Sequence, residues 1–232
     1  MTKILGPGHN SVFCSLALCF KILNMGSRES EMRLFRGLST EAANCTRCPG
    51  MCGRSAVLSE LNGSIEAEVM FIGEAPGRKG ADRTRVPFSG DQSGANFDRF
   101  VNSIGLTRKQ IFITSAALCN PRSESGANRR PTQKELTNCS GFLRRTIEIV
   151  DPRVIVTLGS VALEALKRIH YHELNLKTAA AQLHQWDGRV LVPIYHPSPQ
   201  VLASHRRELQ QLEDYRVVAE AIRLNVSGSV LI

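Results

Sequence analysis

The segment EVMFIGEAPGRKGADRTRVPFSGDQSG, residues 68–94, decides the fold of this chain. Its apolar start, residues 69–72, is typical of a buried strand, and residues 73–77 then form a turn with glycine at both ends. Glycine permits unusual backbone angles and proline fixes one more, so this turn holds the Glu74 carboxylate at the end of a strand. A second turn carries Phe88 on a loop, where a flat ligand could stack on the ring. Because ligands of open α/β sheets bind at the strand ends, the segment indicates one wall of a pocket.

Three further apolar runs have the character of buried strands. They cover residues 111–118, 154–158 and 190–195, and segments with helical apolar spacing lie between them. This alternation predicts an α/β fold: a single domain with a central, mostly parallel four-stranded sheet flanked by helices in three layers. We expect the domain to span residues 41–225.

The N-terminal segment, residues 1–40, does not follow this pattern. It contains an apolar run, residues 11–20, that is too short to span a bilayer and has no convincing signal cleavage site after it. We expect an appendage that is either unstructured or the product of an upstream mis-start, with Met25 or Met32 as the true initiator. Residues 226–232 are expected to form a C-terminal tail.

The charge balance of the 232-residue chain is basic, with 29 Lys and Arg against 21 Asp and Glu, a net charge of +8. An excess of this size suits a polyanionic partner such as nucleic acid, although a basic surface without a specific partner stays open. An apolar content of 42% is enough to bury a full core. Without a secretory signal, we expect a cytoplasmic, reducing location, associated with the nucleoid if DNA is the partner, and no membrane contact.

Seven cysteines are too many to ignore and odd in number. Cys45 and Cys48 form a CxxC pair, and Cys119 and Cys139 flank a loop rich in Pro, Arg, Asn and Gly. In the absence of a secretory context, a metal or cluster site is favoured over a disulfide framework. The ligand type alone leaves an iron–sulfur cluster, zinc and free thiols open, with Cys52 as a competing ligand.

His196 directly follows the last predicted strand and begins the sequence His-Pro-Ser-Pro. A histidine in this position can donate a hydrogen bond to a ligand or merely cap the strand end, and the two prolines stiffen its loop. Because it stands at a strand terminus, as Glu74 does, we place it in the same site.

Taken together, these motifs resemble the uracil-DNA glycosylase superfamily, and most of all its family 4 branch, which carries a [4Fe-4S] cluster. The likeness covers roughly residues 40–224, with the motifs in the order of the family. It implies a DNA repair enzyme, a monofunctional hydrolase that cleaves the N-glycosidic bond of a flipped-out deaminated base, uracil first, and leaves an abasic site. The implied partner is DNA, single- or double-stranded, and a monomer is the expected state.

The resemblance also implies residue roles. Phe88 falls on the ring that stacks against the base, and His196 on the histidine that faces the base O2. Glu74 falls on the water-activating turn, and Asp82 is expected to share its task. The residues implied at the base are Gly73, Ala75, Phe88 and Ser115. The residues implied at the DNA are Arg129, Arg130, Ser198, Arg206, and Val201 or Leu202 as an apolar wedge. The implied cluster ligands are Cys45, Cys48, Cys119 and Cys139.

One departure from the family pattern concerns the substrate. Family 4 members carry asparagine where this chain has Ser115, and a hydroxyl cannot offer the paired donor and acceptor of an amide. This leaves open a glycosylase for hypoxanthine or xanthine. A non-catalytic iron–sulfur DNA-binding protein and a hydrolase of small nucleotides also stay open. A second departure replaces the usual acidic run with residues 78–81, so that Asp82 is its only carboxylate.

Overall fold

The structure is a computed structural model that describes residues 12–51 and 53–226, with side chains described for residues 28–51 and 53–224. Its helices are α1 (Val12–Ala43), α2 (Ala81–Thr84), α3 (Gln92–Ser103), α4 (Gln133–Val150), α5 (Ser160–Leu166), α6 (Leu176–Ala179), α7 (Pro199–Ser204) and α8 (Glu208–Val226). Its strands are β1 (Val69–Gly73), β2 (Ile111–Ser115), β3 (Val154–Leu158), β4 (His184–Trp186) and β5 (Arg189–Ile194). Short 3-10 turns lie at Pro49–Met51, Glu60–Asn62 and Arg108–Gln110.

The sheet has five strands in the order β2-β1-β3-β5-β4. The first four pair in parallel, and β4 pairs antiparallel with β5. The α/β fold with a mostly parallel sheet is therefore confirmed, with one strand more than the four expected. Asp187 and Gly188 join β4 to β5, and both have positive φ, 50° and 74°. A two-residue turn of this kind matches the twist of a hairpin.

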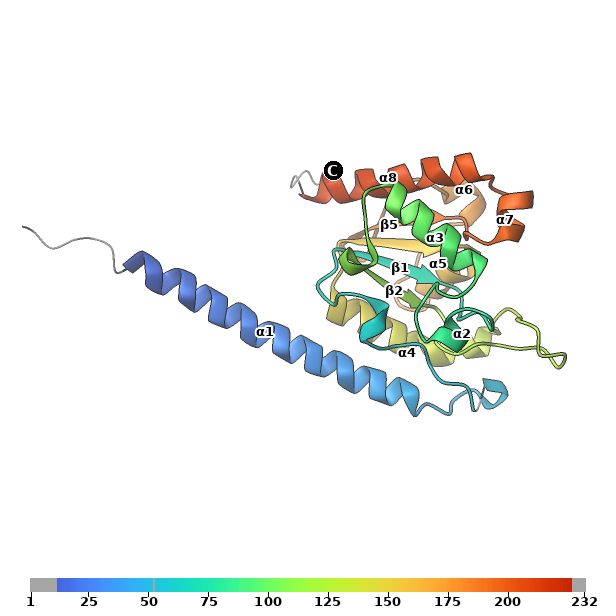
Figure 1. Ribbon diagram of the computed structural model, residues 1–232, viewed down its shortest axis with the longest axis horizontal. Helices are drawn as coiled ribbons and strands as arrows, with labels where there is room; N and C mark the ends of the chain where they lie inside the picture. Colours follow the sequence, from blue (N-terminus) through green and yellow to red (C-terminus); the bar gives the residue numbers. More distant parts are fainter. Residues whose placement is uncertain (1–11, 52, 227–232) are drawn as a thin grey trace, which may run out of the picture.

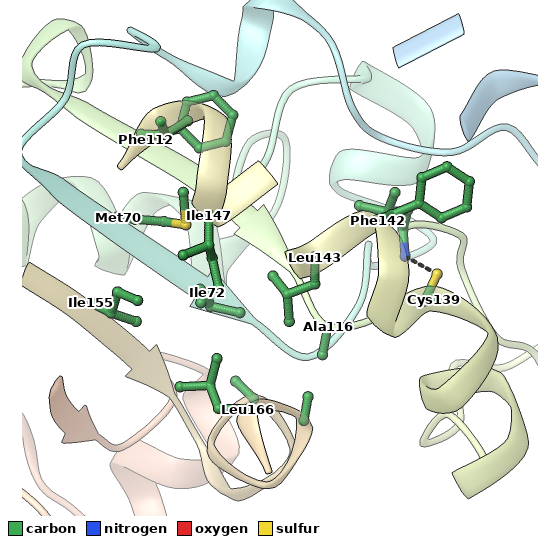
Figure 2. Packing of buried hydrophobic residues seen from close by; sticks show 14 of the residues in the cluster. Met70, Ile72, Phe112, Ala116, Cys139, Phe142, Leu143, Ile147, Ile155 and Leu166 are labelled. Atoms are coloured by element: carbon green, nitrogen blue, oxygen red, sulfur yellow. Dashed lines mark hydrogen bonds between the residues drawn. The ribbon is translucent and has the colours of Figure 1, made fainter. Parts of the chain in front are cut away.

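Helices cover both faces of the sheet, as expected (Figure 1). Met70 and Ile72 of β1 point to one face and pack in a core with α1, α4 and α5. Figure 2 shows this layer, with Leu143 and Ile147 of α4 against the strand. Side chains that alternate with them, such as Phe71, point to the opposite face and pack with α3 and α8. This alternation, the period of a strand, explains how continuous apolar runs produce three layers.

The N-terminal helix α1 crosses the boundary expected at residue 41. Phe35, Leu38 and Ala42 are buried, and the Phe35 ring meets the Phe112 ring edge-on at 5.6 Å. Residues three and four apart share one helix face, so these side chains form a single apolar stripe. The packed core therefore begins before residue 41.

The initiators proposed at Met25 or Met32 remain a prediction. Beyond Val226, the last residue of α8, the expected tail lies outside the described residues. None of the described helices is long and apolar enough to cross a membrane.

Candidate active site

A cavity of about 520 Å³ opens at the carboxyl edge of the sheet. Residues that follow four parallel strands line it: Glu74 after β1, Ser115 at the end of β2, Gly159 after β3 and His196 after β5. The chain leaves β1 for β2 on one side and later places β3 on the other. The cavity thus lies at a topological switch point, where open α/β sheets bind their ligands.

The turn after β1 is fixed to the chain that follows β2. The Gly73 carbonyl accepts from the Ala116 amide at 2.9 Å, and the Glu74 carbonyl accepts from the Ala117 amide at 3.0 Å. The buried Asn120 donates from Nδ2 to the Pro76 carbonyl at 2.6 Å. These bonds hold the Glu74 side chain at the cavity wall.

The environment of Glu74 shifts its proton affinity. Burial raises the pKa of the Glu74 carboxyl above its usual range, and the positive charge of Arg130 opposes this shift. Both side chains line the cavity. A partly desolvated carboxyl beside a cation is typical of a site that handles protons or water.

The Phe88 ring lies against the end of β1. A Cβ atom on Gly73 would stand 2.8 Å from Phe88 Cε2, so the glycine leaves the space that the ring uses. Phe88 itself has φ of 48°, and Arg108 donates to its carbonyl and to that of Pro87. A non-glycine residue in this region is strained, and such strain persists where the surroundings hold it in place. The ring centroid lies 4.9 Å from that of Phe97, which supports it from behind.

His196 stands across the cavity from the turn after β1, with its ring centroid 5.5 Å from that of Phe88. Asn96 of α3 donates to the Pro197 carbonyl at 2.9 Å, and Gln211 of α8 donates to the His196 carbonyl at 3.2 Å. Burial lowers the pKa of His196 to about 4, and the charge of Asp91 opposes the shift. The imidazole is therefore neutral at pH 7, and one of its ring nitrogens carries a proton that it can donate.

The residues predicted at the base converge here. Ala75, Phe88 and Ser115 line the cavity, and Gly73 pairs with Ser115 across β1 and β2. Ser115 Oγ would lie 3.6 Å from a Cβ atom at Gly73, so the serine contributes a short hydroxyl directly beside the Phe88 ring.

The residues predicted to contact DNA divide into those that line the cavity and those that lie outside its lining. Arg129, Arg130, Ser198 and Val201 line the cavity. The Arg130 guanidinium donates to Ser160 Oγ at 2.7 Å. Arg129 also lines the cavity, but both of its terminal nitrogens donate to the Glu135 carboxylate, at 2.6 and 2.8 Å.

Leu202 and Arg206 lie outside the cavity lining. Leu202 packs against the core on the α3 and α8 side. Arg206 forms an ion pair with the buried Asp214, with Nε donating at 3.0 Å, and lies over the Tyr195 ring. Both side chains therefore contribute to packing, and of the two apolar residues predicted as a wedge only Val201 is in the cavity lining.

Asp82, the second carboxylate expected to act on the water, lies outside the cavity lining. Its carboxylate forms ion pairs with Arg122 and, at 3.9 Å, with Arg85, and it does not line the cavity. The short helix α2 begins at Ala81, and it is Ala81 that lines the cavity. Of the two carboxylates expected to act on the water, Glu74 lines the cavity and Asp82 does not, and a shared role for Asp82 remains a prediction.

Sequence reasoning missed Asp91. Its Oδ1 accepts from the Gly94 amide at 2.9 Å and caps α3, and its side chain lines the cavity. A Cβ atom on Gly80 would lie 2.3 Å from Asp91 Oδ2, so the glycine admits the carboxylate. An aspartate directly before a helical pattern is an N-cap signal, and the residues 91–94 carried that signal in the sequence.

None of the four predicted cysteine ligands forms a disulfide with a described residue; Cys139 is buried and the other three are half-buried. Their sulfurs accept hydrogen bonds: Cys139 Sγ from the Leu118 amide and Cys48 Sγ from Asn138 Nδ2, each at 3.4 Å. Burial raises the pKa of the Cys119 thiol to about 11, and the charges of Cys45 and Cys48 add to the shift. Thiols that act on each other in this way lie in one region, although the two pairs are far apart in sequence.

Cys139 joins the same group, since burial raises its pKa to about 12 and the other three cysteines contribute. Within the described residues, no three His, Cys, Asp or Glu side chains are arranged to hold one metal ion. Cys52, proposed as a competing ligand, lies outside the described residues.

Fold and cavity define an α/β enzyme whose site combines an aromatic ring, a neutral histidine and a half-buried carboxyl. A family model described as the uracil DNA glycosylase superfamily matches residues 62–218. The chain is 33% identical to the type-4 uracil-DNA glycosylase of Saccharolobus solfataricus, over 80% of this chain and 85% of the relative. It is 30% identical to the type-4 uracil-DNA glycosylase of Thermotoga maritima, over 81% and 92%. It is also 30% identical to the type-5 uracil-DNA glycosylase of Pyrobaculum aerophilum, over 77% and 89%. The chain therefore belongs to the uracil-DNA glycosylase superfamily.

Proposed function

We propose that this chain hydrolyses the N-glycosidic bond of a deaminated base, uracil first, in DNA and leaves an abasic site. The observation that supports this most is the meeting of Phe88, His196 and Glu74 at one cavity in a member of this superfamily. It acts as a monofunctional glycosylase in base excision repair. Its cytoplasmic, nucleoid-associated location and its monomeric state are part of the proposal.

The cavity suits a flipped base. A base within a duplex cannot be reached, so the nucleotide leaves the stack at a cost of a few kcal/mol. Phe88 supplies a flat apolar surface for the base, with Phe97 behind it. Val201, which lines the cavity on α7, is placed to fill the space that the base leaves in the stack.

His196 supports the departure of the base. Cleavage places negative charge on the base and positive charge on the sugar. A neutral imidazole donates a hydrogen bond to the base oxygen that becomes anionic. Because the ring is already buried, it does not first have to lose its own hydration. A fixed donor in a water-poor site contributes about 3 kcal/mol to such a transition state. Asn96 and Gln211 fix the backbone on which this donor depends.

Glu74 acts on the attacking water. Its carboxylate accepts a hydrogen bond from the attacking water and offsets the positive charge of the sugar. Arg130 favours the charged form of Glu74 against the effect of burial. Ala75 offers no carboxylate, and Asp91, the other carboxylate in the cavity lining, caps α3, so we assign this task to Glu74.

We further propose a [4Fe-4S] cluster on Cys45, Cys48, Cys119 and Cys139. The donor set suits it: thiols gathered from two distant pairs, with amide groups that donate to two of the sulfurs. When bound, the cluster would tie the segment after α1 to the loop before α4.

Ser115 supports a second candidate substrate. The hydroxyl cannot make the two-point contact of an amide with the uracil edge, and it leaves room at the end of β2. Hypoxanthine and xanthine are therefore the second choice of base for the same mechanism.

The test is base release from labelled oligonucleotides that carry uracil, hypoxanthine or xanthine, single-stranded and duplexed, scored as alkali-labile sites. Uracil release that is lost in His196→Ala but retained in His170→Ala supports the proposal, since His170 is exposed and is not among the residues that line the cavity. Release of only another base would change the substrate. No release from any of them, with DNA binding intact, would favour a non-catalytic DNA-binding protein.

A further inference from the structure

A second hollow of about 440 Å³ lies beside the active-site cavity. We name it the arginine hollow, and its lining residues are Gly53, Arg54, Ser55, Asp82, Arg85 and Arg122. Three guanidinium groups face one carboxylate, so the hollow carries an excess of two positive charges. A concentration of charge of this kind attracts an anion.

The arginines of the hollow are oriented in advance. Asp82, with a side chain 10% exposed, pairs with Arg122 and Arg85. Arg85 also donates from Nη1 to the Asp82 carbonyl at 3.0 Å, and Arg122 donates from Nε to Asn120 Oδ1 at 2.6 Å. The Arg85 and Arg122 side chains remain 35% and 28% exposed, and both line the hollow. A fixed guanidinium with free N–H groups matches the oxygens of a phosphate.

The charge count argues against a purely structural role. One carboxylate needs one guanidinium for balance, whereas Asp82 holds two and Arg54 adds a third. Like charges held close together repel each other, and the repulsion falls when an anion binds between them. Within the lining of the hollow, the guanidinium groups therefore outnumber the carboxylate, which favours the binding of an anion.

Two residues connect the arginine hollow with the active-site cavity. Asn120 lines the cavity and holds Arg122, and Ala81 lines the cavity one residue before Asp82. A DNA strand whose base enters the cavity therefore carries its neighbouring phosphates past this hollow.

We propose that the arginine hollow binds a backbone phosphate next to the flipped nucleotide, with Asp82 as the positioning residue for Arg85 and Arg122. This phosphate site rests on the proposed function, because it places the DNA strand next to the flipped nucleotide on one side of the active-site cavity. Phosphate contacts position a strand and do not read its sequence. The hollow thus contributes to affinity for uracil and thymine DNA alike.

The test compares Arg54→Gln/Arg85→Gln with Arg153→Gln. The double variant leaves Arg122 and Asp82 in place. Arg153 lies directly before β3, at the opposite edge of the sheet, where its exposed side chain pairs with Glu68 at 3.8 Å. Binding of a fluorescent uracil oligonucleotide is measured from 50 to 200 mM salt, in the His196→Ala background so that the base is not released.

We expect the double variant to bind DNA about tenfold more weakly at low salt and its plot of log K against log salt to be shallower by about 0.7 to 1. Arg153→Gln should keep the original slope. Equal slopes for the two variants would overturn the proposal. Inorganic phosphate that binds tightly while the DNA slope stays unchanged would assign the hollow to a free phosphate and would also overturn it.

Single-turnover base release separates the hollow from the chemistry. With saturating protein, Arg54→Gln/Arg85→Gln and Asp82→Asn should keep the wild-type rate within a few-fold, while the half-saturating concentration rises for the double variant. A large loss of the saturating rate in Asp82→Asn would return Asp82 to the catalytic machinery and refute its positioning role. If the wild type releases no base, the proposed function fails, whereas the salt slopes still decide on the hollow.

Discussion

The protonation of His196 connects the stability of this fold with its chemistry. Burial lowers the pKa of His196 from its ordinary 6.5 to about 4. Between these values the unfolded chain binds a proton that the folded chain does not. The free energy of unfolding is therefore complete above pH 6.5 and decreases as the pH falls through this window.

The magnitude follows from the size of the shift. Each pH unit is worth about 1.4 kcal/mol, and the window spans about 2.5 units, so His196 removes about 3 kcal/mol of stability by pH 4. A domain of ordinary stability has about 5 to 15 kcal/mol in total, so this loss is large. The substitution His196→Gln removes the titrating ring and with it this dependence.

Urea unfolding at pH 7, 6, 5 and 4 measures the effect. The wild type should lose about 3 kcal/mol relative to His196→Gln across the series, because the contributions of Glu74 and Glu135 cancel in the difference. His170→Gln, the same change at an exposed ring, should parallel the wild type. Parallel curves for the wild type and His196→Gln would refute the reasoning. Base release gives a second readout: it should not decline near pH 6.5, because the His196 ring stays neutral there in the folded protein.

Three further predictions concern the site and the cluster. Gly73→Ala places a methyl group 2.8 Å from Phe88 Cε2 and should displace the ring. Base release should then be at least tenfold slower in single-turnover assays. The control Gly141→Ala, where nothing lies within 4 Å of the added methyl group, should leave the rate unchanged. Ser115→Asn should raise the preference for uracil over hypoxanthine, and an unchanged ratio of release rates would remove serine from the account of selectivity. Cys139→Ser should lower the iron content and the thermal midpoint of anaerobically purified protein, and wild-type protein that holds no iron under the same conditions would contradict the cluster.

The parallel strands could be predicted from the sequence because their apolar runs are continuous and each ends in a turn signal. β4 was missed for a physical reason: it has only three residues, and just Trp186 of them is buried. These residues form a strand because they pair with β5, and their own sequence contains no pattern that predicts this pairing. Only the Asp187-Gly188 pair, typical of a hairpin turn, indicated it.

The site residues also divide into those that the sequence alone could place and those that it could not. Glu74, Phe88 and His196 stand directly after strands or on short turns, so strand position was enough to bring them together. The ion pairs of Asp82 with Arg122 and of Arg206 with Asp214 could not be predicted, because one partner is distant in sequence and the other is hidden in the core. The choice of an ion-pair partner is a tertiary property.

Asp91 shows why the charge state of His196 depends on the whole architecture. A carboxylate near an imidazole favours the charged ring, yet burial prevails and the ring stays neutral. Asp91 accepts the Gly94 amide at the start of α3, where the helix dipole stabilises negative charge. Its carboxylate lies beside Gly77 and Gly80, whose missing side chains provide the space. Since the helix holds the carboxylate in this position, its charge acts on the histidine only from a distance, and the histidine keeps the neutral form that donates to a departing base.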